Sequence, residues 1–212
     1  MPHQPTDSGP ARAGLGESGL NEDPLAQFRH WLEAAALAGL PEPAAAALAT
    51  ATQAARPSVR MVILRAVGLR GVVFHTHYGS RKARELEANP WAALVCYWRE
   101  LERQVRIEGP VEKLSAAESD AYFGTRPVGS RLSAWASPQS GVIPDRVFLE
   151  RRVEELTARY RHGPIPRPPF WGGYHLEAER IEFWRAGPHR LHDRLLYTRA
   201  AEGMWRIERL AP

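Results

Sequence analysis

The sequence predicts an α+β protein in which helices surround an antiparallel β-barrel. Segments with the alternating or β-rich pattern of strands dominate the chain, and the connections between them are short. The helical segments fall between or outside hairpins, so the sequence lacks the regular strand–helix alternation of a parallel sheet. With 212 residues, of which 44% are hydrophobic and 25% charged, the chain can bury one sizeable core. We therefore expect a single folded domain over residues 23–212.

Residues 1–22 differ in composition from the rest of the chain. Pro, Gly, Ser and Thr dominate this tail, and its only sizeable apolar side chains are Met1, Leu15 and Leu20. We expect the tail to be disordered, because it cannot bury enough apolar surface to offset the entropy of ordering. It lacks the apolar block of a signal peptide, and no later segment approaches the roughly 18 apolar residues of a membrane span. A cytoplasmic protein without a membrane segment is the expectation.

The first predicted element is a helix that begins after Asp23. An acidic N-cap followed by Pro24 at the first helical position is a typical helix start, and Gly39 marks the end. Apolar side chains recur at three- and four-residue spacing from Leu25 to Ala35. One face of this helix is therefore expected to be buried.

The next segments are predicted to form strands. The alanine-rich segment 44–55 has a helical composition, but its threonines and its position before a strand favour a first barrel strand. Apolar and polar residues alternate over 57–66, and a second β-rich run covers 71–76. The turn between these two strands is expected at 68–70.

Capping signals place the later helices. Ser80 is a typical N-cap, and Ser115 with Glu118 has the spacing of a capping box. We expect helices over 81–88, 115–125 and 144–160, strands over 91–98 and 103–111, and a closing antiparallel set over 173–184, 194–198 and 204–210.

The net charge of +4 raises the question of nucleic-acid binding, since phosphate backbones attract dense cations. The 28 basic residues are spread along the chain, however, and only Lys82 and Lys113 are lysines. The sequence contains no zinc-finger spacing, no RNP-like aromatic motif and no basic run longer than two residues. We therefore expect no nucleic-acid partner.

A first candidate anion site is the segment from Gly79 to Lys82, at a predicted helix N-terminus directly after a strand. A helix start offers free amide N–H groups and a partial positive charge. Ser80, Arg81 and Lys82 add a hydroxyl and two cations, and Arg60 projects from the neighbouring strand. This combination favours a phosphate site over an ordinary surface helix start.

A second candidate cluster consists of Tyr122, Arg126 and Ser130. The first two lie four residues apart on one helix face, and Pro127 then turns the chain to present the serine. The alternative is a helix C-terminus with a favourable arginine and a half-buried tyrosine. Two separate phosphate sites would suit a phosphorylated cofactor beside a phosphorylated substrate.

The segment from Trp184 to Arg194 carries three arginines, two histidines and an aspartate around a Gly-Pro turn. It is either a solvated loop or a site at a strand end. Metal binding is not expected there, because the arginines beside His189 and His192 oppose a cation. The pair His75 and His77 shares a strand face but has no nearby third ligand.

Several ordered blocks, taken together, resemble the FMN-dependent pyridoxine/pyridoxamine 5′-phosphate oxidase family. The blocks are Arg60-Met61-Val62-Ile63-Leu64, Gly79-Ser80-Arg81-Lys82, Leu101-Glu102-Arg103-Gln104-Val105, Tyr122-Phe123 with Arg126-Pro127, Gln139-Ser140, Phe170-Trp171-Gly172-Gly173, Ile181-Glu182-Phe183-Trp184, His189 to Arg194, and Arg209-Leu210-Ala211-Pro212. The likeness runs from about Asp23 to the last residue.

The resemblance implies a split-barrel FMN-binding fold and a homodimer with flavin sites shared between subunits. It implies oxidation of pyridoxamine and pyridoxine 5′-phosphates to pyridoxal 5′-phosphate, with hydride transfer to flavin N5 and reoxidation by dioxygen to hydrogen peroxide. The implied FMN contacts are Arg60, Met61, Val62, Ile63, Leu64, Arg65, His75, Thr76, Ser80, Arg81, Lys82, Gln104, Gln139, Ser140, Trp184 and Arg194. The implied substrate contacts are Arg65, Tyr122, Arg126, Ser130, Arg190 and His192, and the last two would be the catalytic residues facing the pyridine ring.

The chain departs from the family pattern at three places. Arg65 replaces the usual lysine, His75 replaces the usual tyrosine or phenylalanine, and the tail segment 17–20 lacks the paired arginines of the family's substrate lid. One alternative is a related oxidase of another ring substrate, as in phenazine biosynthesis. A non-enzymatic flavin- or haem-binding barrel is a second alternative, which the presence of Arg190 and His192 disfavours.

Overall fold

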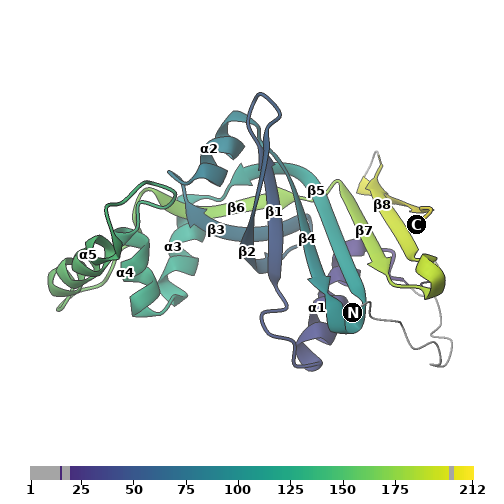
Figure 1. Ribbon diagram of the computed structural model, residues 1–212, viewed down its shortest axis with the longest axis horizontal. Helices are drawn as coiled ribbons and strands as arrows, with labels where there is room; N and C mark the ends of the chain where they lie inside the picture. The colour runs from purple at the N-terminus through teal and green to yellow at the C-terminus, as the bar shows by residue number, and fades with distance from the viewer. Residues whose placement is uncertain (1–14, 16–19, 201–202) are drawn as a thin grey trace, which may run out of the picture.

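The computed structural model describes Leu15, residues 20–200 and residues 203–212 (Figure 1). Its α-helices are α1 (Pro24–Leu37), α2 (Arg81–Ala88), α3 (Ala116–Thr125), α4 (Val128–Ala136) and α5 (Arg146–Arg159). The strands are β1 (Ala45–Ala51), β2 (Pro57–Val67), β3 (Gly71–His77), β4 (Trp91–Trp98), β5 (Arg103–Lys113), β6 (Trp171–Glu177), β7 (Arg180–Arg185), β8 (Asp193–Arg199) and β9 (Trp205–Arg209). Two 3₁₀ turns, Arg99–Leu101 and Pro188–Arg190, precede β5 and β8.

The strands form one antiparallel sheet in the order β4-β1-β2-β3-β6-β5-β7-β8-β9, and an additional β4–β5 pairing closes the first six into a barrel. Strand β5 makes this closure possible because it is long. It pairs with β4 over Arg103–Pro110, with β7 over Arg103–Glu108 and with β6 over Val111–Lys113. Strands β7, β8 and β9 therefore extend the sheet outside the barrel. The expected α+β fold with an antiparallel split barrel and surrounding helices is confirmed.

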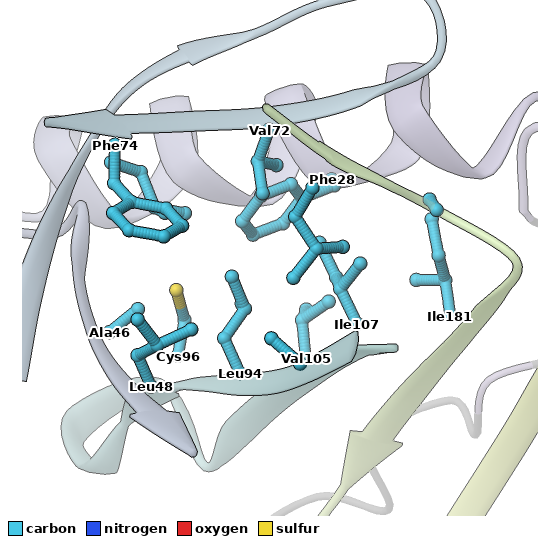
Figure 2. Close-up of a cluster of buried hydrophobic side chains, with 14 of the residues drawn as sticks. Phe28, Ala46, Leu48, Val72, Phe74, Leu94, Cys96, Val105, Ile107 and Ile181 are labelled. Carbon is cyan, nitrogen blue, oxygen red and sulfur yellow. The ribbon is translucent and has the colours of Figure 1, made fainter. Parts of the chain in front are cut away.

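The main hydrophobic core fills the barrel. Side chains from facing strands, including Leu48, Phe74 and Ile107, meet there and are fully buried (Figure 2). Helix α1 adds Phe28 and Trp31 to the same cluster. Burial of a side chain of this size stabilises the fold by about 1.5–3 kcal/mol. The barrel is thus a rigid support for side chains that point outward from its strands.

A smaller second core lies under α3, α4 and α5. Phe123, Leu132, Ile165 and Trp171 are buried together there. These helices project from one side of the barrel, whereas β7 and β8 lie at its opposite side (Figure 1). This separation determines which site residues one chain can bring together.

Most predicted elements are present, and the alanine-rich segment forms strand β1, although a shorter one than expected. Ser115 and Glu118 form the predicted capping box. Helix α4, which begins at Val128 directly after Pro127, is not among the predicted helices. Glycine and serine give α4 a weak propensity, and it is stabilised instead by packing of its apolar face on the second core.

The continuous strand expected over 173–184 is also wrong. The chain forms β6, which pairs with β3, and then β7, which pairs with β5. Between them, the amides of Ala178 and Glu179 donate to the carbonyls of Arg70 and Glu108. The break lets consecutive strands pair with different partners.

The predicted disordered tail over residues 1–22 lies mostly outside the described residues. Within the described part of the chain, no helix is both long and apolar enough to cross a membrane.

Candidate functional site

A cavity of about 280 Å³ opens beside strands β2 and β3 and helices α2 and α3; we call it the β2–β3 cavity. It is lined by Met61, Val62, Ile63, Arg65, His75, Thr76, Lys82, Tyr122, Arg126, Gln139 and Trp171. All of these except Trp171 belong to the predicted site. Trp171 belongs to a sequence block of the resemblance but not to the predicted contacts, because its ring contacts with Tyr122 and His75 depend on the tertiary structure.

Lys82 forms the cationic end of this cavity. It lies in the first turn of α2, where the Ser80 hydroxyl accepts a hydrogen bond from a backbone amide, and it is only 8% exposed. Its Nζ donates to Thr76 Oγ1 (3.0 Å) and Gln139 Oε1 (2.8 Å), which uses two of its three N–H donors. Burial, together with the charge of Arg60, lowers the pKa of Lys82 to about 8. The ammonium is still charged at neutral pH and can receive an anion.

Arg126 and Arg65 form a second cationic cluster around Tyr122. The Arg126 guanidinium carbon lies 4.6 Å from the Trp171 ring centroid, and that of Arg65 lies 6.0 Å from the Tyr122 centroid. Arg126 Nη1 is buried and has no hydrogen-bond partner among the described residues. Such a buried donor is costly unless a ligand satisfies it, and a phosphate oxygen would do so.

The His75 ring contacts the rings of both Tyr122 and Trp171, with centroid distances of 4.0 and 5.3 Å. Burial, together with the charges of Arg126 and Arg65, lowers the pKa of His75 to about 4. The imidazole is therefore neutral in this stack. Both of its nitrogens are buried without a hydrogen-bond partner in the part of the chain that the structure describes.

His75→Phe is expected to raise the free energy of unfolding by about 1 kcal/mol, because it keeps the stacked ring and removes two unsatisfied polar atoms. Urea unfolding of the wild-type and variant chains measures this difference. A loss of stability of similar size would show that the nitrogens are hydrogen bonded, for example to buried water.

The other predicted site residues on β2, at the start of α2, in α4 and in the loop after α4 do not line the cavity. The Ser80 hydroxyl caps α2, and the Leu64 side chain is in the barrel core. Ser130 lies half-buried in α4, and Ser140 has a positive φ of 69° in the loop after it. Arg60 and Arg81 each donate a hydrogen bond to a buried carboxylate on α2.

The remaining predicted residues form a separate group, which we call the β7–β8 cluster; it comprises Gln104, Trp184, Arg190, His192 and Arg194. Strand register places Gln104 opposite Trp184 and Trp184 opposite Arg194. The Trp184 and His192 ring centroids are 4.7 Å apart. The guanidinium of Arg194 donates to both carboxylate oxygens of Glu182, at 2.8 and 3.1 Å.

A tight turn orients the two predicted catalytic residues of this cluster. Its residues His189 and Arg190 have φ values of 52° and 63°, in the left-handed region. The Gly187 amide donates to His192 Nδ1 at 3.2 Å. A neutral His192 therefore carries its proton on Nε2 and presents a hydrogen-bond donor there.

The two groups do not meet within one chain. No member of the β7–β8 cluster lines the β2–β3 cavity, and the strands that carry the cluster lie across the barrel from α3 (Figure 1). Each chain therefore presents the predicted site residues as two separate groups, which we call half-sites.

The described chain has a closed six-stranded barrel with a three-stranded extension, and a cavity lined by a buried lysine and two arginines. These features define a split-barrel protein with a cationic cavity beside its barrel. Residues 32–160 match the family model for pyridoxamine 5′-phosphate oxidase, and residues 171–212 match the pyridoxine 5′-phosphate oxidase C-terminal dimerisation region. The chain belongs to the pyridoxamine 5′-phosphate oxidase family, whose cofactor is FMN.

Individual proteins support this assignment. The chain is 58% identical to a pyridoxine/pyridoxamine 5′-phosphate oxidase of Rubrobacter xylanophilus over 95% of its length and 92% of that protein's. It is 55% identical to the oxidase of the same description from Burkholderia thailandensis, with 95% of each chain covered.

Two solved structures are similar. PhzG from Burkholderia lata, in complex with tetrahydrophenazine-1-carboxylic acid, has a TM-score of 0.89 at 38% identity, covering 96% of this chain and 100% of that one. A pyridoxamine 5′-phosphate oxidase-related, FMN-binding protein from Nostoc punctiforme has a TM-score of 0.71 at 20% identity, covering 88% and 96%, and shows the fold alone.

Proposed function

We propose that this protein is an FMN-dependent oxidase that converts pyridoxamine 5′-phosphate and pyridoxine 5′-phosphate to pyridoxal 5′-phosphate. The observation that supports it is the presence of two cationic clusters in one cavity. Lys82, with Thr76 and Gln139, would hold the phosphate of FMN. Arg126, with Arg65 beside Tyr122, would hold the phosphate of the substrate. The unpartnered Arg126 Nη1 fits this role.

Bound FMN would supply the hydride acceptor for the substrate carbon next to the pyridine ring, with dioxygen as the final oxidant. The protein must chiefly stack the two rings and fix the distance between them. Arg190 would face the pyridine ring, and His192 would donate from Nε2 to a ring substituent. With Nδ1 occupied by the Gly187 amide, His192 orients the substrate in this proposal and does not act as the base.

We propose that the complete site forms between two subunits. A two-fold dimer can place the β7–β8 cluster of one chain against the β2–β3 cavity of the other, and it repeats this contact at a second site. The match to a C-terminal dimerisation region supports a homodimer.

An exposed apolar face on β2 and β4 also favours this assembly. Val59, Met61 and Tyr97 are all more than half exposed there. Met61 lines both the β2–β3 cavity and a second cavity of about 370 Å³ on this face. The apolar surface thus reaches the edge of the site, and large exposed apolar patches mark interfaces.

FMN affinity is expected to fall as pH rises above about 8. The ammonium of Lys82 is charged below its pKa of about 8 and loses its charge above it, so its attraction for the phosphate is lost in that direction. Titration of the flavin-free chain with FMN between pH 6.5 and 9.5 measures the effect. Lys82→Met should bind FMN more weakly throughout and should lack this pH dependence; an unchanged dependence would assign it to another group.

The direct test is to purify the protein, record its visible spectrum and add pyridoxamine 5′-phosphate without oxygen. We expect a bound flavin whose visible absorption bleaches and returns when air is admitted. No bound flavin, or a flavin that the substrate fails to bleach, would contradict the proposal.

A phenazine-type oxidase is the second candidate, because the similar PhzG structure holds a tetrahydrophenazine carboxylic acid. The cationic cluster of Arg126 and Arg65 favours a phosphate ester over this ring substrate. Comparing pyridoxamine with its 5′-phosphate separates the candidates: the proposed function requires a large preference for the phosphorylated compound. Faster bleaching by a reduced phenazine carboxylate would favour the alternative.

A further inference from the structure

Glu85 is a buried carboxylate on α2 that none of the assigned site roles includes. Its side chain is 5% exposed and points toward β1 and β2. It accepts four hydrogen bonds, from Thr50 Oγ1 (2.5 Å), Ser58 Oγ (2.6 Å), Arg60 Nη2 (3.2 Å) and Arg81 Nε (2.8 Å).

The carboxylate is ionised in this environment. Burial alone would raise its pKa, but the hydrogen bonds from Ser58, Thr50, Arg81 and Arg60 outweigh burial and lower the pKa of Glu85 to about 2. One buried negative charge therefore offsets one of the two positive charges of Arg60 and Arg81, which leaves a net positive charge.

These contacts fix the direction of the arginines. Besides Glu85, Arg60 donates from Nη1 to the Leu48 carbonyl (3.2 Å) and Thr50 Oγ1 (2.6 Å), so its guanidinium is held from several sides. Arg60 and Arg81 bind the same carboxylate, and Lys82 follows Arg81 in the first turn of α2. Three cations thus gather around the first turn of α2, next to the Lys82 end of the cavity.

Stability alone is a poor explanation for this arrangement. Burying ions costs several kcal/mol each, and buried ion pairs are often no more stabilising than apolar side chains of the same size. A buried carboxylate that orients cations at a helix N-terminus is instead what a preorganised phosphate site requires.

We propose that Glu85 is a positioning residue for the phosphate of FMN: it holds Arg60 and Arg81 at the start of α2 so that, with Lys82, they receive the phosphate. This inference rests on the proposed placement of the flavin phosphate. If Glu85 positions the arginines, its removal weakens FMN binding. If Glu85 only repels the phosphate through its negative charge, its removal strengthens FMN binding.

The test is to titrate the flavin-free full-length chain with FMN and with riboflavin, which lacks the phosphate, and to follow flavin fluorescence. In Glu85→Gln we expect the FMN dissociation constant to rise about tenfold or more, and that of riboflavin to change by less than about twofold. Glu87→Gln is the matched control on the same helix, since Glu87 is exposed and pairs with Lys113; both affinities should stay unchanged. Unchanged or tighter FMN binding in Glu85→Gln, or an equal loss for both flavins, would overturn the proposal.

Two further variants complete the design. If Glu85→Gln does not fold, Ser58→Ala must still weaken FMN more than riboflavin, because the Ser58 hydroxyl donates to the carboxylate and accepts from Arg60. Lys82→Met separates this inference from the proposed function. If Lys82→Met loses FMN selectively and Glu85→Gln does not, only the Glu85 role fails; if neither is selective, the phosphate placement fails as well.

Discussion

An equal mixture of Lys82→Met and Arg190→Met subunits, reassorted into dimers, is expected to recover about one quarter of wild-type activity, although each variant alone is nearly inactive. Lys82 lies in the β2–β3 cavity and Arg190 in the β7–β8 cluster, and one chain does not bring these half-sites together. In a mixed dimer, one site combines both altered halves and the other combines both native halves. Because about half of randomly reassorted dimers are mixed, about one site in four is native.

The experiment requires co-expression or mild reassortment of the two chains, with FMN at a level that saturates the wild type but not Lys82→Met. Mixing Lys82→Met with Arg126→Met is the matched control. Both changes lie in the same half-site, so no native site can form and no activity should return. Equal recovery in the two mixtures, or none in the first, would contradict a site shared between subunits.

The second large effect is expected for Arg190→Met alone, which should lower kcat by about 100-fold or more while FMN stays bound. Arg190 has a positive φ of 63° in the turn before β8, and this strained turn sets the direction of its side chain. A methionine preserves length and apolar contact but removes the planar charge that would face the substrate ring.

Steady-state kinetics together with the visible spectrum of the purified variant measure both parts of this expectation. Arg180→Met on β7 is a suitable control, because Arg180 is exposed, pairs with Glu108 and lies outside the β7–β8 cluster. If Arg190→Met lost FMN and kept its turnover at saturating FMN, the cofactor and substrate roles of the two half-sites would have to be exchanged.

Local signals in the sequence were sufficient for most of the fold. Asp23, Ser80 and Ser115 each accept a hydrogen bond from a backbone amide at the predicted helix start, because capping depends on residues only two or three positions apart. Alternating patterns likewise located the barrel strands, since side-chain direction along a strand has a period of two. The sequence did not predict helix α4, because packing on the second core stabilises this helix more than its own helix propensity does.

The site was less predictable than the fold. The sequence alone determined which residues are available: a lysine and a serine at one helix start, Tyr122 and Arg126 on one helix face, and the charged turn before β8. Only the tertiary structure decided how they are grouped. Strand order places the turn outside the barrel and the cavity on its other side, and it brings Glu85 to Arg60 across two elements. Such groupings depend on pairings between segments far apart in the chain, which short-range patterns do not encode.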